Sequence, residues 1–268
     1  MNHLHRELAP ISSEAWDQIE TEASRTLRHY LVARRIVDFS GPLGWEHAAE
    51  PTGRTTDLEA PADNVEARMR QVQPLIELRA PFAMPRAEID AIAAGARDAD
   101  LDPVRDAARH LALIEDGTVF EGYAAGQIAG IGQRSPYPAV GITDNYADYP
   151  SLVARAVATL QQEGVGGPYA LALGPRCYTG VVETTESGGY PLLEHVRLIL
   201  GGPVFWAPAV DGAIVLSTRG GDYALTVGQD VSIGYLQHDA ASVSLYLEES
   251  IAFRVLSPEA AVPLRYGG

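Results

Sequence analysis

The sequence predicts an α+β fold. Segments with helical periodicity are expected at about 13–37, 86–97 and from 102 onward, and strand-like runs dominate the tail after 222. The two kinds of segment do not alternate regularly, as they would in a parallel β–α–β sheet. The chain has 268 residues, of which 46% are hydrophobic and 21% are charged. That is enough apolar material for one large domain or two ordinary ones.

The first expected element is a long amphipathic helix over about 13–37. Ser12 and Ser13 are candidate N-caps, and Arg34 and Arg35 are cations in the expected last turn. Its apolar stripe recurs every three or four positions and comprises Trp16, Ile19, Ala23, Leu27, Tyr30 and Leu31. Glycines and prolines over 40–53 then break the pattern.

Residues 54–83 predict a long two-stranded excursion. Extended runs at 54–59 and 75–82 flank a polar segment at 62–70, with few apolar residues to bury against one another. Because a bare hairpin is marginally stable in water, we expect this segment to pack on another chain.

The remaining elements are helices mixed with short strands. A long helix is expected from Asp102, the predicted N-cap, with Pro103 at its first position. Further helices are expected at 151–162 and 191–200, and strands at 169–173, 204–209 and 213–217. The tail carries strand-like runs at 223–227, 231–235, 243–249 and 251–256.

Composition and motifs exclude several function classes. The net charge of −15 disfavours nucleic-acid binding, and all 20 basic residues are Arg, so lysine chemistry is impossible. The lone Cys177 is expected to be buried, and Glu248 and Glu249 to lie on a solvated strand face. No catalytic or metal-ligating constellation emerges, so we expect no enzyme activity and no cofactor. Without a signal-peptide core or a run of about 20 apolar residues, the sequence predicts a cytoplasmic protein with no membrane partner.

Several stretches resemble encapsulin shell proteins, the family also grouped with linocin-type bacteriocins. The matching stretches are LAPISSEAWDQIE (8–20), RRIVDFSGPLGWEHAA (34–49), LIELRAPF (75–82), IEDGTVFEGY (114–123), GPYALAL (167–173), GYPLLEHV (189–196), STRGGDYALTVGQDVSIGY (217–235) and SLYLEESIAF (244–253). They follow one another in order over nearly the whole chain.

The resemblance implies the fold of tailed-phage major capsid proteins. In that fold, residues 1–49 would hold the N-terminal helix and the start of the P-domain, and 50–83 the extended E-loop. The P-domain would continue through 84–134 with its spine helix and return over 223–268, while 135–222 would form the A-domain. The E-loop strands would be completed by a neighbouring subunit.

The resemblance also implies a function. The chain would be a self-assembling, non-catalytic subunit of a closed cytoplasmic nanocompartment, an icosahedral shell of 60 copies in its smallest form. The shell would enclose cargo enzymes that carry a short C-terminal docking peptide. The expected cargo is a dye-decolourising peroxidase, with a ferritin-like protein as the alternative.

Two candidate sites follow from the matched motifs. The docking groove of the family would comprise Leu27, Leu31, Arg34, Asp38, Phe39, Asp230, Val231, Ile233 and Tyr235. An apolar trough with a few charged groups suits a short peptide, and Arg34 and Asp38, four residues apart, are expected to share a helix face. The five-fold pore loop would comprise Glu183, Thr184, Thr185, Glu186, Ser187, Gly188, Gly189 and Tyr190. A ring of its carboxylates would favour cations.

Some relatives hold a flavin against an aromatic residue near position 87. Here the segment is Met84-Pro85-Arg86-Ala87, without an aromatic residue, and flavin is not expected. Two alternatives remain open. One is a prophage capsid protein of the same fold, although this chain lacks the lysine needed for isopeptide cross-links. The other is a secreted bacteriocin or protease, disfavoured by the missing signal peptide and catalytic residues.

Overall fold

The computed structural model describes residues 3–186 and 188–267. Its helices are α1 Ser13–Tyr30, α2 Arg86–Ala93, α3 Asp102–Phe120, α4 Ile131–Arg134, α5 Tyr149–Gln162, α6 Pro175–Glu183 and α7 Leu192–Leu200. Its strands are β1 Asp38–Ser40, β2 Ala49–Ala62, β3 Val65–Pro74, β4 Ile76–Pro85, β5 Val140–Ile142, β6 Tyr169–Leu173, β7 Val204–Trp206, β8 Ala213–Ser217, β9 Tyr223–Val227, β10 Ser232–His238, β11 Ser242–Val255 and β12 Ala261–Tyr266.

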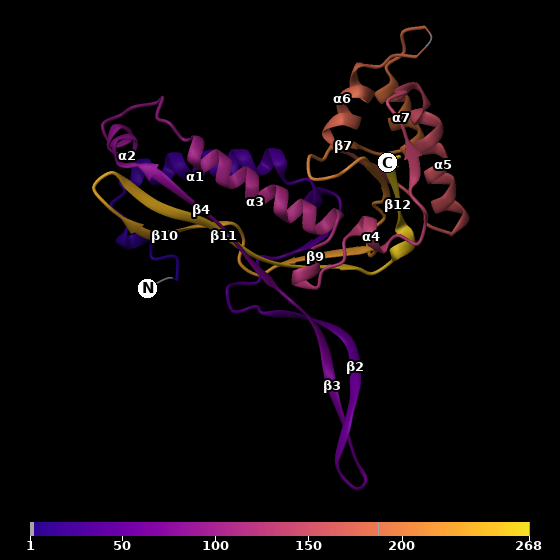
Figure 1. The fold of residues 1–268 in the computed structure, drawn as a ribbon, viewed down its shortest axis with the longest axis horizontal. Helices are drawn as coiled ribbons and strands as arrows, with labels where there is room; N and C mark the ends of the chain where they lie inside the picture. Colours follow the sequence, from indigo (N-terminus) through magenta and orange to yellow (C-terminus); the bar gives the residue numbers. More distant parts are fainter. Residues whose placement is uncertain (1–2, 187, 268) are drawn as a thin grey trace.

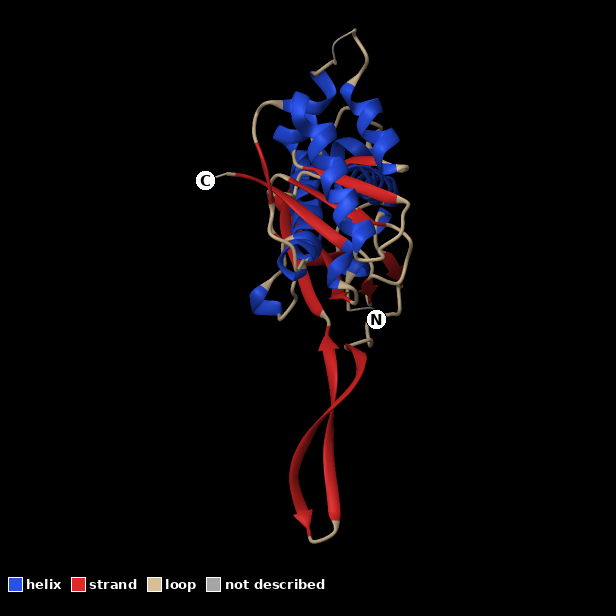
Figure 2. Cartoon of the chain, turned by 90° about the vertical axis from the view of Figure 1, so that its right-hand side faces the viewer, coloured by secondary structure: helices blue, strands red, loops and turns tan. Residues whose placement is uncertain are grey.

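These strands form two five-stranded sheets and a separate two-stranded arm. In the first sheet the order is β1-β9-β11-β10, with β4 also paired to β11, and helices α1 and α3 cover one face (Figure 1). In the second sheet the order is β5-β12-β8-β6-β7, with α5, α6 and α7 beside it. The pair β2-β3 extends away from both sheets (Figure 2).

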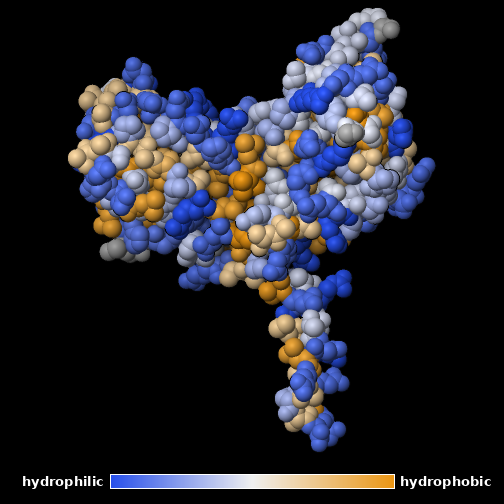
Figure 3. All heavy atoms as spheres, viewed as in Figure 1, coloured by the Kyte–Doolittle hydropathy of each residue, from blue (hydrophilic) through white to orange (hydrophobic). Residues whose placement is uncertain are grey.

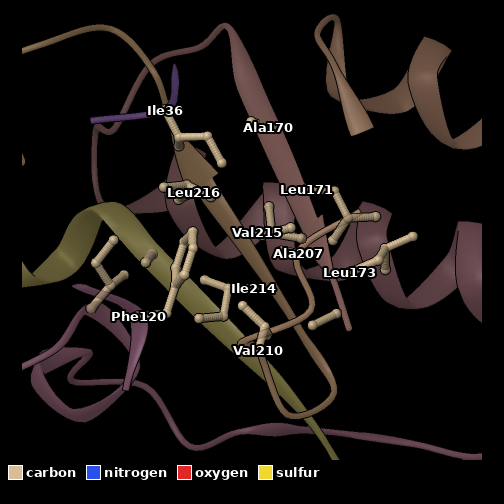
Figure 4. Packing of buried hydrophobic residues seen from close by; sticks show 14 of the residues in the cluster. Ile36, Phe120, Ala170, Leu171, Leu173, Ala207, Val210, Ile214, Val215 and Leu216 are labelled. Atoms are coloured by element: carbon tan, nitrogen blue, oxygen red, sulfur yellow. The ribbon is translucent and has the colours of Figure 1, made fainter. Parts of the chain in front are cut away.

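Each sheet is held by its own apolar cluster. The first sheet packs on α1, α2 and α3 through residues such as Ile19, Val104 and Leu245. The larger cluster fills the second sheet and its junction with the first; Figure 4 shows Leu171 and Val215 from neighbouring strands packed in it. Because apolar residues recur along the helix faces and run continuously through β6 and β8, the sequence pattern predicts much of this core.

The helix boundaries differ in detail from the expected ones. Ser12 is the N-cap of α1, as expected, since its side chain accepts a hydrogen bond from the Ala15 N–H. The helix ends at Tyr30 rather than near 37, because the backbone N–H groups of Val32 and Ala33 donate to the buried carboxylate of Asp116. The predicted N-cap Asp102 is instead the first residue of α3.

The excursion is also paired differently from our expectation. Its strands are β2 and β3, so the polar segment 62–70 is largely strand, and the run 75–82 belongs to β4 in the first sheet. The arm has almost no buried residues, and its strands lack the clean alternation that would have identified them.

Three further placements concern expected features. Cys177 is buried, as expected, and contacts the Tyr149 and Tyr266 hydroxyls. The expectation for Glu248 and Glu249 is wrong, because both are fully buried and paired with arginines from distant segments. The expected P-domain return over 223–268 includes strand β12, which pairs with β8 and β5 in the second sheet.

Candidate functional site

A groove of about 540 Å³ lies between α1, the N-terminal segment and β10. One wall is the side of α1 that carries Ala23, Leu27 and Arg28, at the border of the core, and the other is the start of β10 with the turn before it. Its lining residues are Leu4, Arg6, Glu20, Ala23, Ser24, Leu27, Arg28, Leu31, Arg34, Arg35, Asp230, Val231, Ser232, Ile233 and Leu247. The groove therefore combines an apolar floor with charged groups at its margins.

Six of the nine residues expected in the docking groove line this hollow: Leu27, Leu31, Arg34, Asp230, Val231 and Ile233. Phe39 reaches it indirectly, since the Arg34 guanidinium lies 5.3 Å from the centre of its ring. Tyr235 lies farther along β10, where its hydroxyl contacts His238. Asp38 faces a different hollow and accepts a hydrogen bond from the Gly221 N–H.

Arg34 and Asp38 do not share a helix face, which corrects that expectation. Arg34 lies in a single 3₁₀ turn after α1, and Asp38 begins β1. Because the chain leaves the helix at Tyr30, the four-residue spacing no longer brings the two side chains together.

Arg34 is instead held by three carboxylates from distant segments. Its guanidinium donates to Glu115 at 2.6 Å, to Asp230 at 2.7 Å and to Glu249 at 2.9 Å. Glu115 and Glu249 are fully buried, whereas Asp230 is 46% exposed at the groove margin. This cluster fixes the plane of Arg34, joining α3, β11 and the turn before β10 behind the groove.

The cluster carries more carboxylates than one arginine neutralises. Burial, followed by the charge of Glu115, raises the pKa of Glu249 well above its usual range, which favours a proton on this carboxyl. Burial alone would lower the pKa of Arg34, but the hydrogen bond and charge of Glu115 outweigh it and raise that pKa. Arg34 is therefore a permanent cation at the margin of the groove.

Asp116, next to this cluster, gives a testable pH dependence. Burial raises the pKa of Asp116 from its usual 3.8 to about 7, despite the N–H groups of Ala33 and Val32 that bond to it. The folded protein binds this proton more tightly than the unfolded chain does. The stabilisation of the folded state by this bound proton is therefore complete below about pH 4, and it is lost as the pH rises through about 7.

We expect Asp116→Asn to flatten this part of the stability profile, since the amide oxygen still accepts the two N–H groups but does not ionise. Between about pH 5 and 8 the free energy of unfolding of the wild type should fall on the order of 2–4 kcal/mol more than that of the variant. Thermal unfolding across this range measures the difference. Asp106→Asn, at an exposed position of the same helix, is the control and should follow the wild type. Parallel profiles for Asp116→Asn and the wild type would contradict the assignment.

The N-terminal segment closes one end of the groove. The Leu4 side chain is 6% exposed, and its carbonyl accepts a hydrogen bond of 2.9 Å from the Tyr235 N–H. His3 stacks on Trp45 at 3.9 Å and contacts the buried Glu248 at 3.0 Å. Arg6 pairs with Glu20 on α1. These contacts fasten the segment to both walls of the groove.

The expected pore loop lies at the tip between α6 and α7, in the upper part of Figure 2. Glu183 ends α6, and the Thr184 hydroxyl donates to the Gly180 carbonyl. Thr185 bridges to Pro191, and the Glu186 N–H donates to the Tyr190 carbonyl. Gly188 and Gly189 have φ values of 103° and 82°, which favour glycine, and Ser187 lies outside the described residues. The Glu186 carboxylate contacts Nδ1 of His195 at 2.5 Å.

The β2-β3 arm has two unlike faces. Leu58 lies opposite Ala67, and Thr56 lies opposite Met69, so these residues share one face. The other face is polar: Asp57 pairs with Arg68, and Thr55 lies opposite Arg70. Apolar and polar residues both show along the arm in Figure 3. Leu58 and Met69 are 49% and 56% exposed, which is unusual for such side chains unless another surface covers them.

No helix in the described parts of the chain is long and apolar enough to cross a membrane. Likewise, no group of three or more possible metal-ligating side chains occurs among those residues.

The chain has the fold of tailed-phage major capsid proteins and related shells. A virus-like particle from Pyrococcus furiosus matches with a TM-score of 0.68 at 18% identity, covering 94% of this chain and 100% of that chain. The capsid of the Myoviridae phage XM1 matches with a TM-score of 0.52 at 11% identity, covering 86% and 90% of the two chains.

Sequence comparison assigns the chain to one family within this fold. The Linocin_M18 family model, described as "Encapsulating protein for peroxidase", matches residues 1–252. The type 1 encapsulin shell protein of Rhodospirillum rubrum is 56% identical over 271 residues, covering 99% of this chain and 97% of its own. That of Mycobacterium tuberculosis is 45% identical over 266 residues, covering 99% and 100%. The chain belongs to the encapsulin shell-protein family.

Sequence reasoning missed parts of the groove. Glu115 and Glu249 gave no signal, because their burial depends on an arginine more than 80 positions away from either one. Leu4 was missed because a terminus is ordinarily assumed to be mobile. The signal that could have found it is an apolar residue between two histidines, four positions before the start of a matched stretch.

Proposed function

We propose that the shell built by this chain encloses cargo enzymes, and that the groove between α1 and β10 holds the C-terminal docking peptide of the cargo. The observation that carries this proposal is the combination of Leu27, Leu31 and Ile233 with the fixed cation Arg34 in one groove. Such a hollow has an apolar floor to bind a short peptide and a few charges to orient it.

For the cargo itself we propose a dye-decolourising peroxidase. The family description, "Encapsulating protein for peroxidase", supports this choice over a ferritin-like protein. The test is to express the shell with each candidate, intact or lacking its C-terminal segment, and to measure the cargo retained per shell. Retention of the intact peroxidase and loss of the truncated form are the expected results. Retention of only the ferritin-like protein would replace the peroxidase proposal.

We propose a closed icosahedral shell of 60 copies, in which residues 50–83 act as the E-loop that joins neighbours. The exposed apolar face of the β2-β3 arm supports this role. The P-domain would comprise the first sheet with α1 and α3, and the A-domain the second sheet, to which β12 then belongs. Negative-stain microscopy should show hollow particles without DNA, whereas DNA-filled particles would favour a prophage capsid.

Such a shell should contain no covalent bonds between subunits. The chain has no lysine for an isopeptide bond, and its one cysteine is buried. Boiled, unreduced shells on a denaturing gel should therefore run as a monomer of 28.7 kDa. A ladder of oligomers that survives reduction would contradict this expectation.

We further propose that the loop 183–190 lines the five-fold pore and that its carboxylates favour cations. The Glu186 carboxylate contacts His195, and the exposed carboxylate of Glu183 adds a second negative charge to the same loop. Glu186→Gln should increase the turnover of anionic substrates by enclosed cargo relative to cationic ones, and salt should reduce the gain. Cargo turnover with matched charged substrates measures this ratio.

Two further variants test the pore proposal, one inside the loop and one outside it. Glu183→Gln should shift the ratio in the same direction, whereas Glu194→Gln, on α7 beyond the loop, should leave it unchanged. An unchanged ratio in both loop variants would assign transport to another opening.

A further inference from the structure

A second hollow, of about 710 Å³, lies between α1 and α3, which run side by side in Figure 1. It is distinct from the groove beside β10, since Arg28 is the one lining residue that the two have in common. Four arginines line it, Arg25 and Arg28 from α1 and Arg105 and Arg109 from α3. They face three carboxylates, so the lining is positively charged in a chain whose net charge is −15.

Two of these carboxylates hold two of the arginines in place. One oxygen of Glu22, whose side chain is 10% exposed, accepts hydrogen bonds from Arg25 at 2.8 Å and from Arg105 at 2.7 Å. Asp102 also contacts Arg105. Glu22 thus brings together two cations from different helices at the edge of the hollow.

The other two arginines, Arg28 and Arg109, form no ion pair with any residue in the parts of the chain that the structure describes. The Arg109 guanidinium lies 5.6 Å from the centre of the Tyr30 ring. That ring packs in turn on His29 and Trp206, with centroids 4.9 and 5.5 Å away. An aromatic ring attracts a cation through its face and leaves the N–H groups of the guanidinium available to an anion.

The spacing of the arginines suits a short chain of phosphate groups. On each helix the two arginines are three or four residues apart, so they share a face and are separated by about one turn, roughly 5.4 Å along the axis. Guanidinium groups bind phosphate oxygens through paired N–H bonds. A single phosphate would reach only part of the two rows, whereas a long nucleic acid would meet the negative charge of the rest of the chain.

We propose that the hollow between α1 and α3 binds a short chain of phosphate groups, held by Arg28 and Arg109 with Arg25 and Arg105 beside them. Inorganic tripolyphosphate and the triphosphate of a nucleotide present this chemistry alike. The proposed site does not depend on cargo docking, and its test uses the full-length protein without cargo.

Calorimetric titration with tripolyphosphate, ATP, orthophosphate and citrate tests the ligand class. Tripolyphosphate should bind at least about tenfold more tightly than orthophosphate, since it reaches more of the arginines. Equal affinities for tripolyphosphate and ATP would assign the site to the phosphate chain alone, and tighter binding of ATP would assign it to a nucleotide. Citrate or orthophosphate binding as tightly as tripolyphosphate would overturn the proposal.

Three variants test the position of the site. Arg109→Gln should weaken tripolyphosphate binding about tenfold, because it removes charge-assisted hydrogen bonds. Arg155→Gln removes the same charge from an exposed position on α5 and should stay within about twofold of the wild type. Asp106→Asn removes the third carboxylate of the lining, which is exposed, and should tighten binding about two- to fivefold.

Two results with the protein variants count against the site. Equal weakening by Arg109→Gln and Arg155→Gln would indicate attraction to the surface as a whole, and absence of tripolyphosphate binding to the wild type would remove the site altogether. Circular dichroism confirms that each variant is folded. If Arg109→Gln does not fold, the gain expected for Asp106→Asn still decides the question, because unchanged or weaker binding by that variant contradicts the proposal.

Discussion

Met69→Asp should abolish shell formation and leave folded, unassembled subunits. Met69 is 56% exposed on the apolar face of the arm, beside Leu58 and Ala67. If a neighbouring subunit covers this face, a buried Met contributes about 1.5–3 kcal/mol at each contact, and a buried aspartate costs more than that. Repetition of the contact around a closed shell multiplies the effect. Size-exclusion chromatography and microscopy measure the loss of particles, and circular dichroism shows that the subunit remains folded.

Thr55→Asp is the matched control for this variant. It adds the same single charge to the same arm, but on the opposite face, where Thr55 lies across from Arg70. Shells should form normally with this change. Assembly by Met69→Asp, or equal failure of both variants, would show that the apolar face is not what neighbours recognise.

Leu27→Asp should reduce cargo loading at least about tenfold while leaving shells intact. Leu27 is half-buried on the groove side of α1, so the change removes an apolar contact of about 1.5–3 kcal/mol and places a charge against the peptide. Ile233→Asp would place a charge in the same groove. However, Ile233 is only 5% exposed and packs in the core under α1, so its loss would also destabilise the subunit. Leu27→Asp therefore tests cargo docking with less effect on the stability of the subunit than Ile233→Asp.

The comparison for Leu27→Asp is Thr21→Asp, on the same helix but outside the groove. Both shells should assemble, and cargo co-purified per shell should fall only for Leu27→Asp. Equal cargo in the two variants would remove α1 from the docking site.

The sequence predicted local elements well and long-range pairing poorly. The strands Tyr169–Leu173 and Ala213–Ser217 have the bounds expected of them, because continuous apolar runs between glycine and proline signals identify buried strands. The arm was misassigned, since a strand with both faces exposed carries no hydrophobic pattern to fix its partner.

In the candidate groove, too, the sequence predicted the local features but not those that depend on distant residues. Leu27 and Leu31 lie where the helical stripe puts them, and Val231 and Ile233 where the matched motif does. The end of α1 could not be predicted, because it depends on Asp116, more than 80 residues away. Glu249 was misplaced for a related reason: a strand rich in charge is expected to be solvated unless a buried partner such as Arg34 is known.

The arm and the first sheet are mechanically one piece. Only Leu75 separates β3 from β4, and its N–H donates to the Ala48 carbonyl at the base of the arm. All 10 residues of β4 are register partners of β11, the central strand of the first sheet. A force on the arm is therefore transmitted along β4 to its pairing with β11. In this direction the hydrogen bonds of the pair are loaded together in shear. They would break one after another only if β4 were pulled away from β11 sideways. Tension between neighbouring subunits would thus be carried into the sheet, and a strained particle should deform elastically before any single subunit unravels.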